Sequence, residues 1–191
     1  MRTVGTFLVA LFLANFTFAQ SFEGVITMNT SNSEMKEEAS ITWYQKGDRS
    51  RMDIVSQAGE YNTEYSIISD GKGTHMVSQG HVTDVPQSAL KSDVATQSLV
   101  SETKGVKMNG FDCDQIVYTD GVNRTVYWLT DGLGITYNDL PAFIKKNMPS
   151  VSSNGFPVRM EKRNKDGKVI LSQDVISVQA STVDESKFKR N

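Results

Sequence analysis

The sequence has little of the chemistry that metals and redox reactions need: one cysteine and two histidines in 191 residues. A single cysteine cannot form a disulfide within the chain, and two histidines without a third ligand at suitable spacing do not make a catalytic zinc site. A phosphate-binding glycine loop, a dinucleotide fingerprint and a G-x-S-x-G nucleophile elbow are also missing. We therefore expect no metal, no cofactor, no catalytic residues and no enzymatic activity. A hydrolase built from dispersed carboxylates stays open, because the sequence does not tell which acids approach one another.

Charge of one sign and long apolar runs are also scarce. The formal net charge is −2, which does not favour binding to nucleic acid. One apolar run, residues 4–18, lies between Arg2 and Ala19, the pattern of a cleaved export signal, and it is shorter than the roughly 20 residues that span a bilayer. We expect a signal peptide over residues 1–19, no transmembrane anchor after its removal, and one β-rich domain over residues 20–191. This domain would be periplasmic or extracellular, and the missing cysteine at the cleavage point argues against a lipid anchor.

Short β-type runs bounded by turn residues recur along the whole chain. Asp-Gly pairs, which supply the positive φ angles of two-residue hairpin turns, follow or join several of them. We therefore predict a mainly β fold, a single antiparallel meandering sheet that curls into an open half-barrel. Its nine predicted strands lie within residues 22–30, 40–45, 50–55, 64–69, 74–78, 113–119, 123–130, 156–164 and 168–178.

Two segments break the β pattern. Residues 86–102 have Leu90 and Val94 at helical spacing, and residues 138–149 have apolar residues between an early and a terminal proline. We predict one or two short helices here, which would form a lid over one face of the sheet.

Cys113 lies between Asp112 and Asp114. A catalytic thiolate needs a positive field, whereas two aspartates would raise the pKa of the thiol. Alternation along a strand places Cys113 on one face with Phe111 and Val117, and both aspartates on the other. We predict a buried, inert thiol, with an intermolecular disulfide as the alternative.

His75 and His81, the two histidines, flank a turn-like sequence and are expected to be exposed to solvent. Residues 162–173 resemble part of a calcium-binding loop but lack its first and last carboxylates. We therefore predict a hairpin turn there.

Methionines and aromatic residues recur in the predicted strands and in the second lid segment. Methionine is flexible and polarisable, so it suits an irregular core or an adaptable apolar pocket. If the sheet is concave, these residues could line a site for an acyl chain or another apolar ligand. The candidate ligand-binding residues are Trp43, Met52, Met76, Trp128, Phe143 and Met160.

Four short motifs then point to a known family: "GFDC" at 110–113, "VYWLTDGLGI" at 126–135, "GFPVRMEKRNKDGK" at 155–168 and "STVDESKF" at 181–188. In their order they resemble the exported bacterial proteins grouped as domain of unknown function 4412. That family is distantly similar to the lipoprotein-localisation (Lol-type) carriers, whose curved antiparallel sheet with helical lids shelters acyl chains. The resemblance implies an open barrel with the two lid segments over its mouth, and it supplies no catalytic residue.

The leading hypothesis is a non-enzymatic periplasmic or secreted protein that binds an apolar or lipid-bearing ligand in a half-barrel cavity. The alternative is a cell-envelope module that binds another protein, with a filled core and an exposed apolar patch instead of a ligand cavity.

Overall fold

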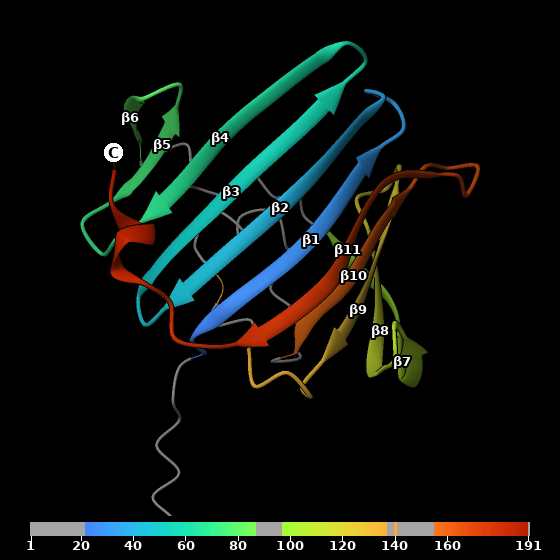
Figure 1. Cartoon of the computed structure of the whole chain (residues 1–191). Helices are drawn as coiled ribbons and strands as arrows, with labels where there is room; N and C mark the ends of the chain where they lie inside the picture. Colours follow the sequence, from blue (N-terminus) through green and yellow to red (C-terminus); the bar gives the residue numbers. More distant parts are fainter. Residues whose placement is uncertain (1–21, 87–96, 137–139, 141–154, 191) are drawn as a thin grey trace, which may run out of the picture.

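The computed structural model describes residues 22–86, 97–136, 140 and 155–190, which form one antiparallel sheet of eleven strands (Figure 1). Nine strands overlap the predicted runs, whereas β6 and β7 were not predicted. The predicted signal peptide lies outside the described residues. The strands are β1 (Gly24–Asn32), β2 (Glu37–Lys46), β3 (Arg49–Ala58), β4 (Tyr61–Ser69), β5 (Thr74–Ser78), β6 (His81–Val85), β7 (Ser98–Met108), β8 (Phe111–Thr119), β9 (Arg124–Thr130), β10 (Phe156–Arg163) and β11 (Val169–Ala180).

Two meanders make up the sheet, whose strand order is β6-β5-β4-β3-β2-β1-β11-β10-β9-β8-β7. The first and last strands, β1 and β11, pair antiparallel at its centre and join the two meanders. The sheet is open, with β6 and β7 at its edges. The predicted single antiparallel sheet is confirmed, and it does not close into a barrel.

The Asp-Gly turns join neighbouring strands as the sequence predicts. Gly71 and Gly121, between β4 and β5 and between β8 and β9, have φ angles of 76° and 89°. The Asp120 carboxylate accepts hydrogen bonds from the backbone nitrogens of Asn123 and Val122 at 2.7 and 2.9 Å, and these bonds lower the pKa of Asp120 to about 2. The calcium-loop-like segment is likewise a hairpin turn between β10 and β11.

The predicted helical lid is not seen, because the only helix in the described residues is a short 3₁₀ helix, Glu185–Phe188. Of the first lid segment, residues 87–96 lie outside the described part, and Ser98–Glu102 belong to β7 instead of a helix. These exposed residues, which include Leu99 and Val100, form an edge strand because they pair with β8. All of the second segment except Leu140 lies outside the described residues. Within the described ranges, no helix is long and apolar enough to cross a bilayer.

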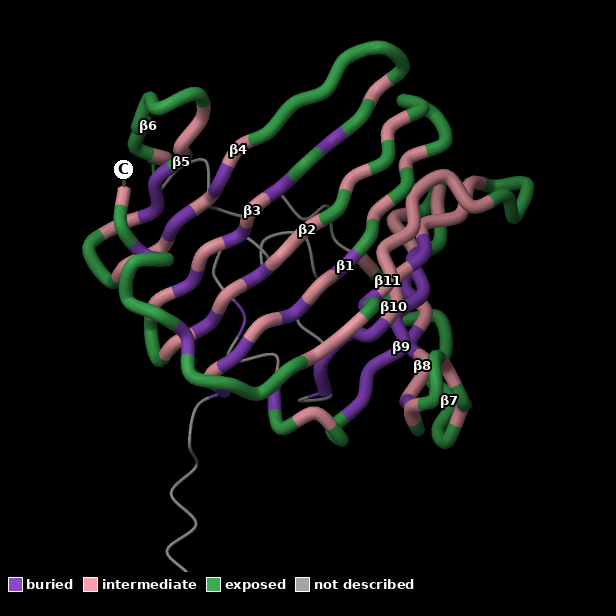
Figure 2. The backbone as a smooth tube through the Cα atoms, viewed as in Figure 1, coloured by how far each residue is buried: buried purple, intermediate pink, exposed green. Residues whose placement is uncertain are grey.

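The sheet curls toward the face that carries Ile26, Trp43 and Met52, here called the concave face. Trp43 on β2 and Phe156 on β10 are three strands apart, a distance of roughly 14 Å in a flat sheet. Their stacked rings nevertheless have centroids 6.0 Å apart, as expected when the two strands curve toward each other. Figure 2 shows buried and less buried residues alternating along β1 to β3, and a continuous buried run along β9.

The C-terminal segment packs on the opposite, convex face. Arg51, whose side chain points away from neighbouring Met52, donates a hydrogen bond to the Lys187 carbonyl at 3.1 Å. The Arg49 guanidinium lies 5.0 Å from the centroid of the buried Phe188 ring and also pairs with Glu185. The hydrogen bonds from Arg49 and Lys46 lower the pKa of Glu185 to about 2. The chain end therefore covers one end of the convex face of β2 to β4, whereas the concave face forms the core.

Candidate functional site

Two rows of apolar side chains cross the concave face from strand to strand. Paired residues of antiparallel strands share a face, so the register of the sheet places each row directly. Both rows contain methionine, an aromatic residue and isoleucine, and they carry no charged group. The first row is Ile26, Trp43, Met52, Ile67 and Met76 on β1 to β5, and the second is Met28, Ile41, Ile54 and Tyr65 on β1 to β4.

Three of the six predicted ligand-binding residues, Trp43, Met52 and Met76, thus belong to one row. Met76 is 38% exposed, because β5 lies next to the edge of the sheet. Met160 shares the concave face, because it pairs with Gln173, whose amide nitrogen donates to the Met28 sulfur at 3.2 Å. Four of the predicted residues therefore lie on one face.

The other two predicted residues do not join this group. Trp128 pairs with Arg159, which forms an ion pair with Asp174 at 2.8 Å on the convex face. The Arg159 guanidinium lies 5.8 Å from the centroid of the Trp128 ring. Trp43 and Trp128 are both buried and belong to one hydrophobic core cluster, but their strand partners place them on opposite faces of the sheet. Phe143 lies outside the described residues.

A row of uncharged polar side chains lies beside the first apolar row. Gln45 pairs with Ser50, Ser50 with Ser69, and Ser69 with Thr74, all on the concave face. Gln45 and Ser50 are buried, at 6% and 2% exposure. We did not predict these residues, although alternation gives the signal: Gln45 follows Trp43 by two positions and Ser50 precedes Met52 by two.

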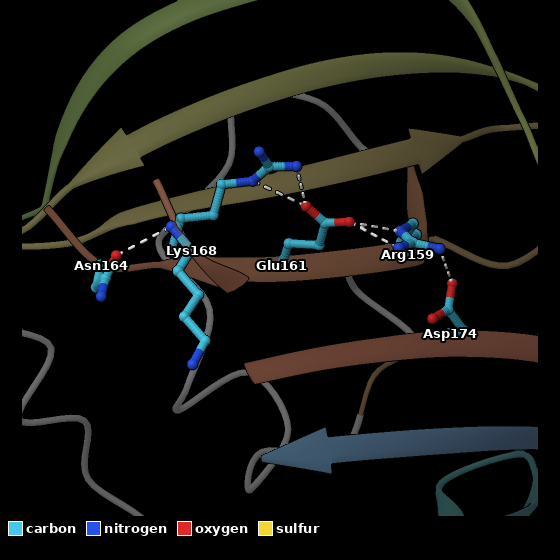
Figure 3. A network of polar contacts seen from close by, with 6 residues as sticks. Arg159, Glu161, Asn164, Lys168 and Asp174 are labelled. Atoms are coloured by element: carbon cyan, nitrogen blue, oxygen red, sulfur yellow. Dashed lines mark hydrogen bonds and ion pairs between the residues drawn. The ribbon is translucent and has the colours of Figure 1, made fainter. Parts of the chain in front are cut away.

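The convex face of β10 and β11 carries a charged network centred on Glu161 (Figure 3). Its Oε1 accepts hydrogen bonds from Nε and Nη2 of Arg159 at 3.0 and 2.7 Å, and its Oε2 accepts from Arg163 Nε at 2.9 Å. Burial alone would raise the pKa of Glu161, but the hydrogen bonds from the two arginines hold it below its usual value. The network lies next to the irregular register between Pro157 and Arg159, where β10 shifts relative to β9.

Cys113 is buried, as predicted, with 2% of its surface exposed. Burial raises the pKa of its thiol, and the nearby carboxylates of Asp112 and Asp114 raise it further. An elevated pKa leaves little thiolate, the form that attacks electrophiles. The geometry thus supports a packed thiol.

The prediction for His75 is wrong: it is 6% exposed, whereas His81 is exposed as expected. His75 pairs with Asp84 across the β5–β6 hairpin, and its Nδ1 lies 2.6 Å from the Asp84 carboxylate. Asp70 lies 3.8 Å from the other ring nitrogen and forms an ion pair with Arg190. No group of three or more His, Cys, Asp or Glu side chains arranged to hold a metal occurs within the described part of the chain.

The outer side of the sheet also has a hollow of about 820 Å³ over the ends of β1 to β4. Its lining is mainly polar and acidic, including Asn29, Glu38, Gln57 and Glu64. None of the six predicted residues lines it, so this hollow is separate from the apolar rows.

Comparison with known families decides where the chain belongs. The family described as Domain of unknown function (DUF4412) matches residues 22–190. The chain belongs to this family. The resemblance of the four sequence motifs to DUF4412 proteins is therefore confirmed. No functionally curated protein matches this DUF4412 chain.

Several solved structures are similar to this DUF4412 protein at low sequence identity. An uncharacterized conserved protein from Thermus thermophilus is 15% identical, with a TM-score of 0.57 over 91% of this chain and 87% of the other. MucB in its complex with MucA from Pseudomonas aeruginosa is 10% identical, with a TM-score of 0.48 over 90% and 56%. A domain from Vibrio parahaemolyticus described as an outer membrane lipoprotein-sorting protein is 11% identical, with a TM-score of 0.39 over 88% and 90%. The first likeness establishes the fold and no activity.

Proposed function

We propose that this DUF4412 protein binds the apolar chain of a lipid or of a lipid-bearing ligand on the concave face of its sheet and catalyses no reaction. The observation that carries the proposal is the pair of adjacent apolar rows on that face. The longer row, from β1 to β5, spans four strand spacings of about 4.8 Å, or roughly 19 Å. A row of this length matches an extended hydrocarbon chain, although its members Ile26, Trp43 and Met52 are buried in the hydrophobic core.

The energetics of the proposed site follow from burial of methylene groups. Each CH₂ group transferred from water to an apolar surface contributes about 0.8 kcal/mol, so even a partly enclosed chain gains several kcal/mol. Met28, Met52, Met76 and Met160 share the face, and methionine adapts its shape to irregular ligands. The two apolar rows carry no charge and contain methionine, so they are expected to accept chains that differ in length or branching.

The proposed location is the periplasm or the extracellular space. Its support is the sequence pattern of residues 1–19, a short apolar run after a basic residue and before a small one. A carrier of apolar chains has a clear use there, because lipids released from a membrane must cross water.

The exposed apolar residues give less support to the alternative, a protein-binding module with an apolar patch. Within the described residues, large exposed apolar side chains are distributed over six strands and two turns. Such single exposed side chains are normal on a protein surface.

Tryptophan fluorescence tests the proposal. A Trp128→Phe variant leaves Trp43 as the sole tryptophan, and titration with a 16-carbon acyl lipid should change its emission in a saturable way. The matched Trp43→Phe variant keeps only Trp128, on the convex face, and should show little change. Absence of any saturable signal in both variants, with no lipid retained in equilibrium dialysis, would overturn the proposal.

A further inference from the structure

Three polar atoms at one end of the concave face have no hydrogen-bond partner. They are Trp43 Nε1, Gln45 Oε1 and Ser50 Oγ, and each is shielded from solvent. Their residues are 0%, 6% and 2% exposed. Buried polar groups in folded proteins are nearly always paired, so three unpaired atoms in one place call for an explanation.

The register brings the three residues together. Gln45 and Ser50 are directly opposite each other on β2 and β3, and Trp43 is the next residue of β2 on the same face. The other end of the Gln45 amide is already fixed, because its nitrogen donates to the Gly47 carbonyl at 2.6 Å. The amide oxygen is thus held in place and accepts nothing.

The chemistry of the three atoms defines which hydrogen-bonding group could pair with them. The indole N–H donates, the amide oxygen accepts and the hydroxyl does either. A group that both donates and accepts hydrogen bonds, such as a hydroxyl next to an ester or an amide, fits this set.

The polar row carries no formal charge. Gln45, Ser50, Ser69 and Thr74 are all uncharged, and Lys46 next to Gln45 is turned to the convex face, where it pairs with Glu185 at 3.1 Å. An anionic carboxylate or phosphate would be buried here without a cation, which is strongly unfavourable.

We propose that the ligand is an amphiphile with an uncharged, hydrogen-bonding head. The chain would lie on the apolar rows, and the head would bind Trp43 Nε1, Gln45 Oε1 and Ser50 Oγ. This inference rests on the proposed function and adds to it the class of ligand and the end of the face that recognises the head.

The test compares three probes with the same 16-carbon chain in the Trp128→Phe background: a monoacylglycerol, the free fatty acid and the alkane. The monoacylglycerol should bind at least about tenfold more tightly than either other probe, the value of roughly one satisfied hydrogen bond. Ser50→Ala should reduce that preference about tenfold.

Ser56→Ala is the matched control. Ser56 is on the same strand and face and is also buried, but its hydroxyl already donates to the Glu37 carboxylate. This variant should keep the preference for the monoacylglycerol. Without ligand, Ser50→Ala should be at least as stable as the unmodified chain, because it removes an unpaired buried hydroxyl, whereas Ser56→Ala should be less stable.

The outcomes separate the two proposals. Binding of all three probes with equal affinity, tighter binding of the fatty acid, or an unchanged preference in Ser50→Ala would overturn the assignment of the head and leave chain binding intact. Failure of every probe to bind would overturn both.

Discussion

Replacing Glu161 by glutamine should destabilise the sheet where β10 bends. The Glu161 side chain is 7% exposed, and each of its oxygens is held by an arginine, Arg159 or Arg163. Glutamine keeps the shape but offers one oxygen in place of two and removes the negative charge. One arginine therefore faces an amide N–H₂ group. Both groups donate hydrogen bonds, so no hydrogen bond forms between them.

The size of the loss follows from burial. Breaking a fully buried ion pair costs about 3–5 kcal/mol, because an unpaired charge is left behind. Here Arg159 and Arg163 are 29% and 42% exposed, so they can turn partly to water, and we expect a loss of about 2–3 kcal/mol. For a domain of this size, that corresponds to a decrease in Tm of roughly 4–12 °C.

Urea denaturation of Glu161→Gln, beside the control Glu64→Gln, measures this loss. Glu64 is exposed on β4, and its replacement should change the free energy of unfolding by less than about 0.5 kcal/mol.

The pKa of Glu161 in the folded protein lies below its usual value of 4.5. The contribution of Glu161 to the free energy of unfolding is therefore present above pH 4.5 and disappears as the pH falls through the lower value. The difference between Glu161→Gln and the unmodified chain should therefore shrink in acid. Equal stability of the two variants at pH 7 would show that the ion pairs of Glu161 with Arg159 and Arg163 do not stabilise the fold.

Three further predictions concern other parts of the fold. Asp120→Asn should lower the free energy of unfolding at pH 7 by about 1 kcal/mol, a value that includes a discount for screening by solvent. In acid, its unfolding should depend less on pH between roughly pH 4 and 2. The reason is that the ionised Asp120 carboxylate stabilises the fold above that range and loses this effect as it is protonated. The Cys113 thiol should react with a disulfide reagent at pH 8 far more slowly in the folded than in the unfolded chain; equal rates would contradict its burial. Phe188→Ala should reduce the free energy of unfolding by about 2–3 kcal/mol in urea, and a loss below about 0.5 kcal/mol would show that the C-terminal segment does not hold the convex face.

Hairpin chemistry made most of the sheet predictable. The Asp120-Gly121 and Asp166-Gly167 turns lie between strands whose residues alternate or are largely apolar, so both their ends and their partners follow from local sequence. β7 was missed because an edge strand exposed to solvent needs no apolar alternation, and Ser98–Met108 has little. The pairing of β1 with β11 joins opposite ends of the chain and has no local signal.

The candidate site was harder to predict because the face of a residue depends on long-range register. Trp43 and Trp128 both lie in predicted strands, yet bulges in β10 and β11 and the order of the strands decide that they lie on opposite faces. The sequence suggested that His75 is an exposed hairpin residue. It is instead buried, and its ring nitrogen is paired with the carboxylate of Asp84 on the neighbouring strand. The unpaired atoms of Gln45 and Ser50 follow from packing in three dimensions, which alternation alone does not describe.

Native mass spectrometry of the protein purified from its own host, followed by lipid analysis of the released ligand, measures directly whether the protein carries an acyl chain. If the concave face binds an acyl chain, the protein should carry one acyl-chain species at close to one per protein. A mass that corresponds to the protein alone, unchanged after incubation with lipids of that host, would contradict it.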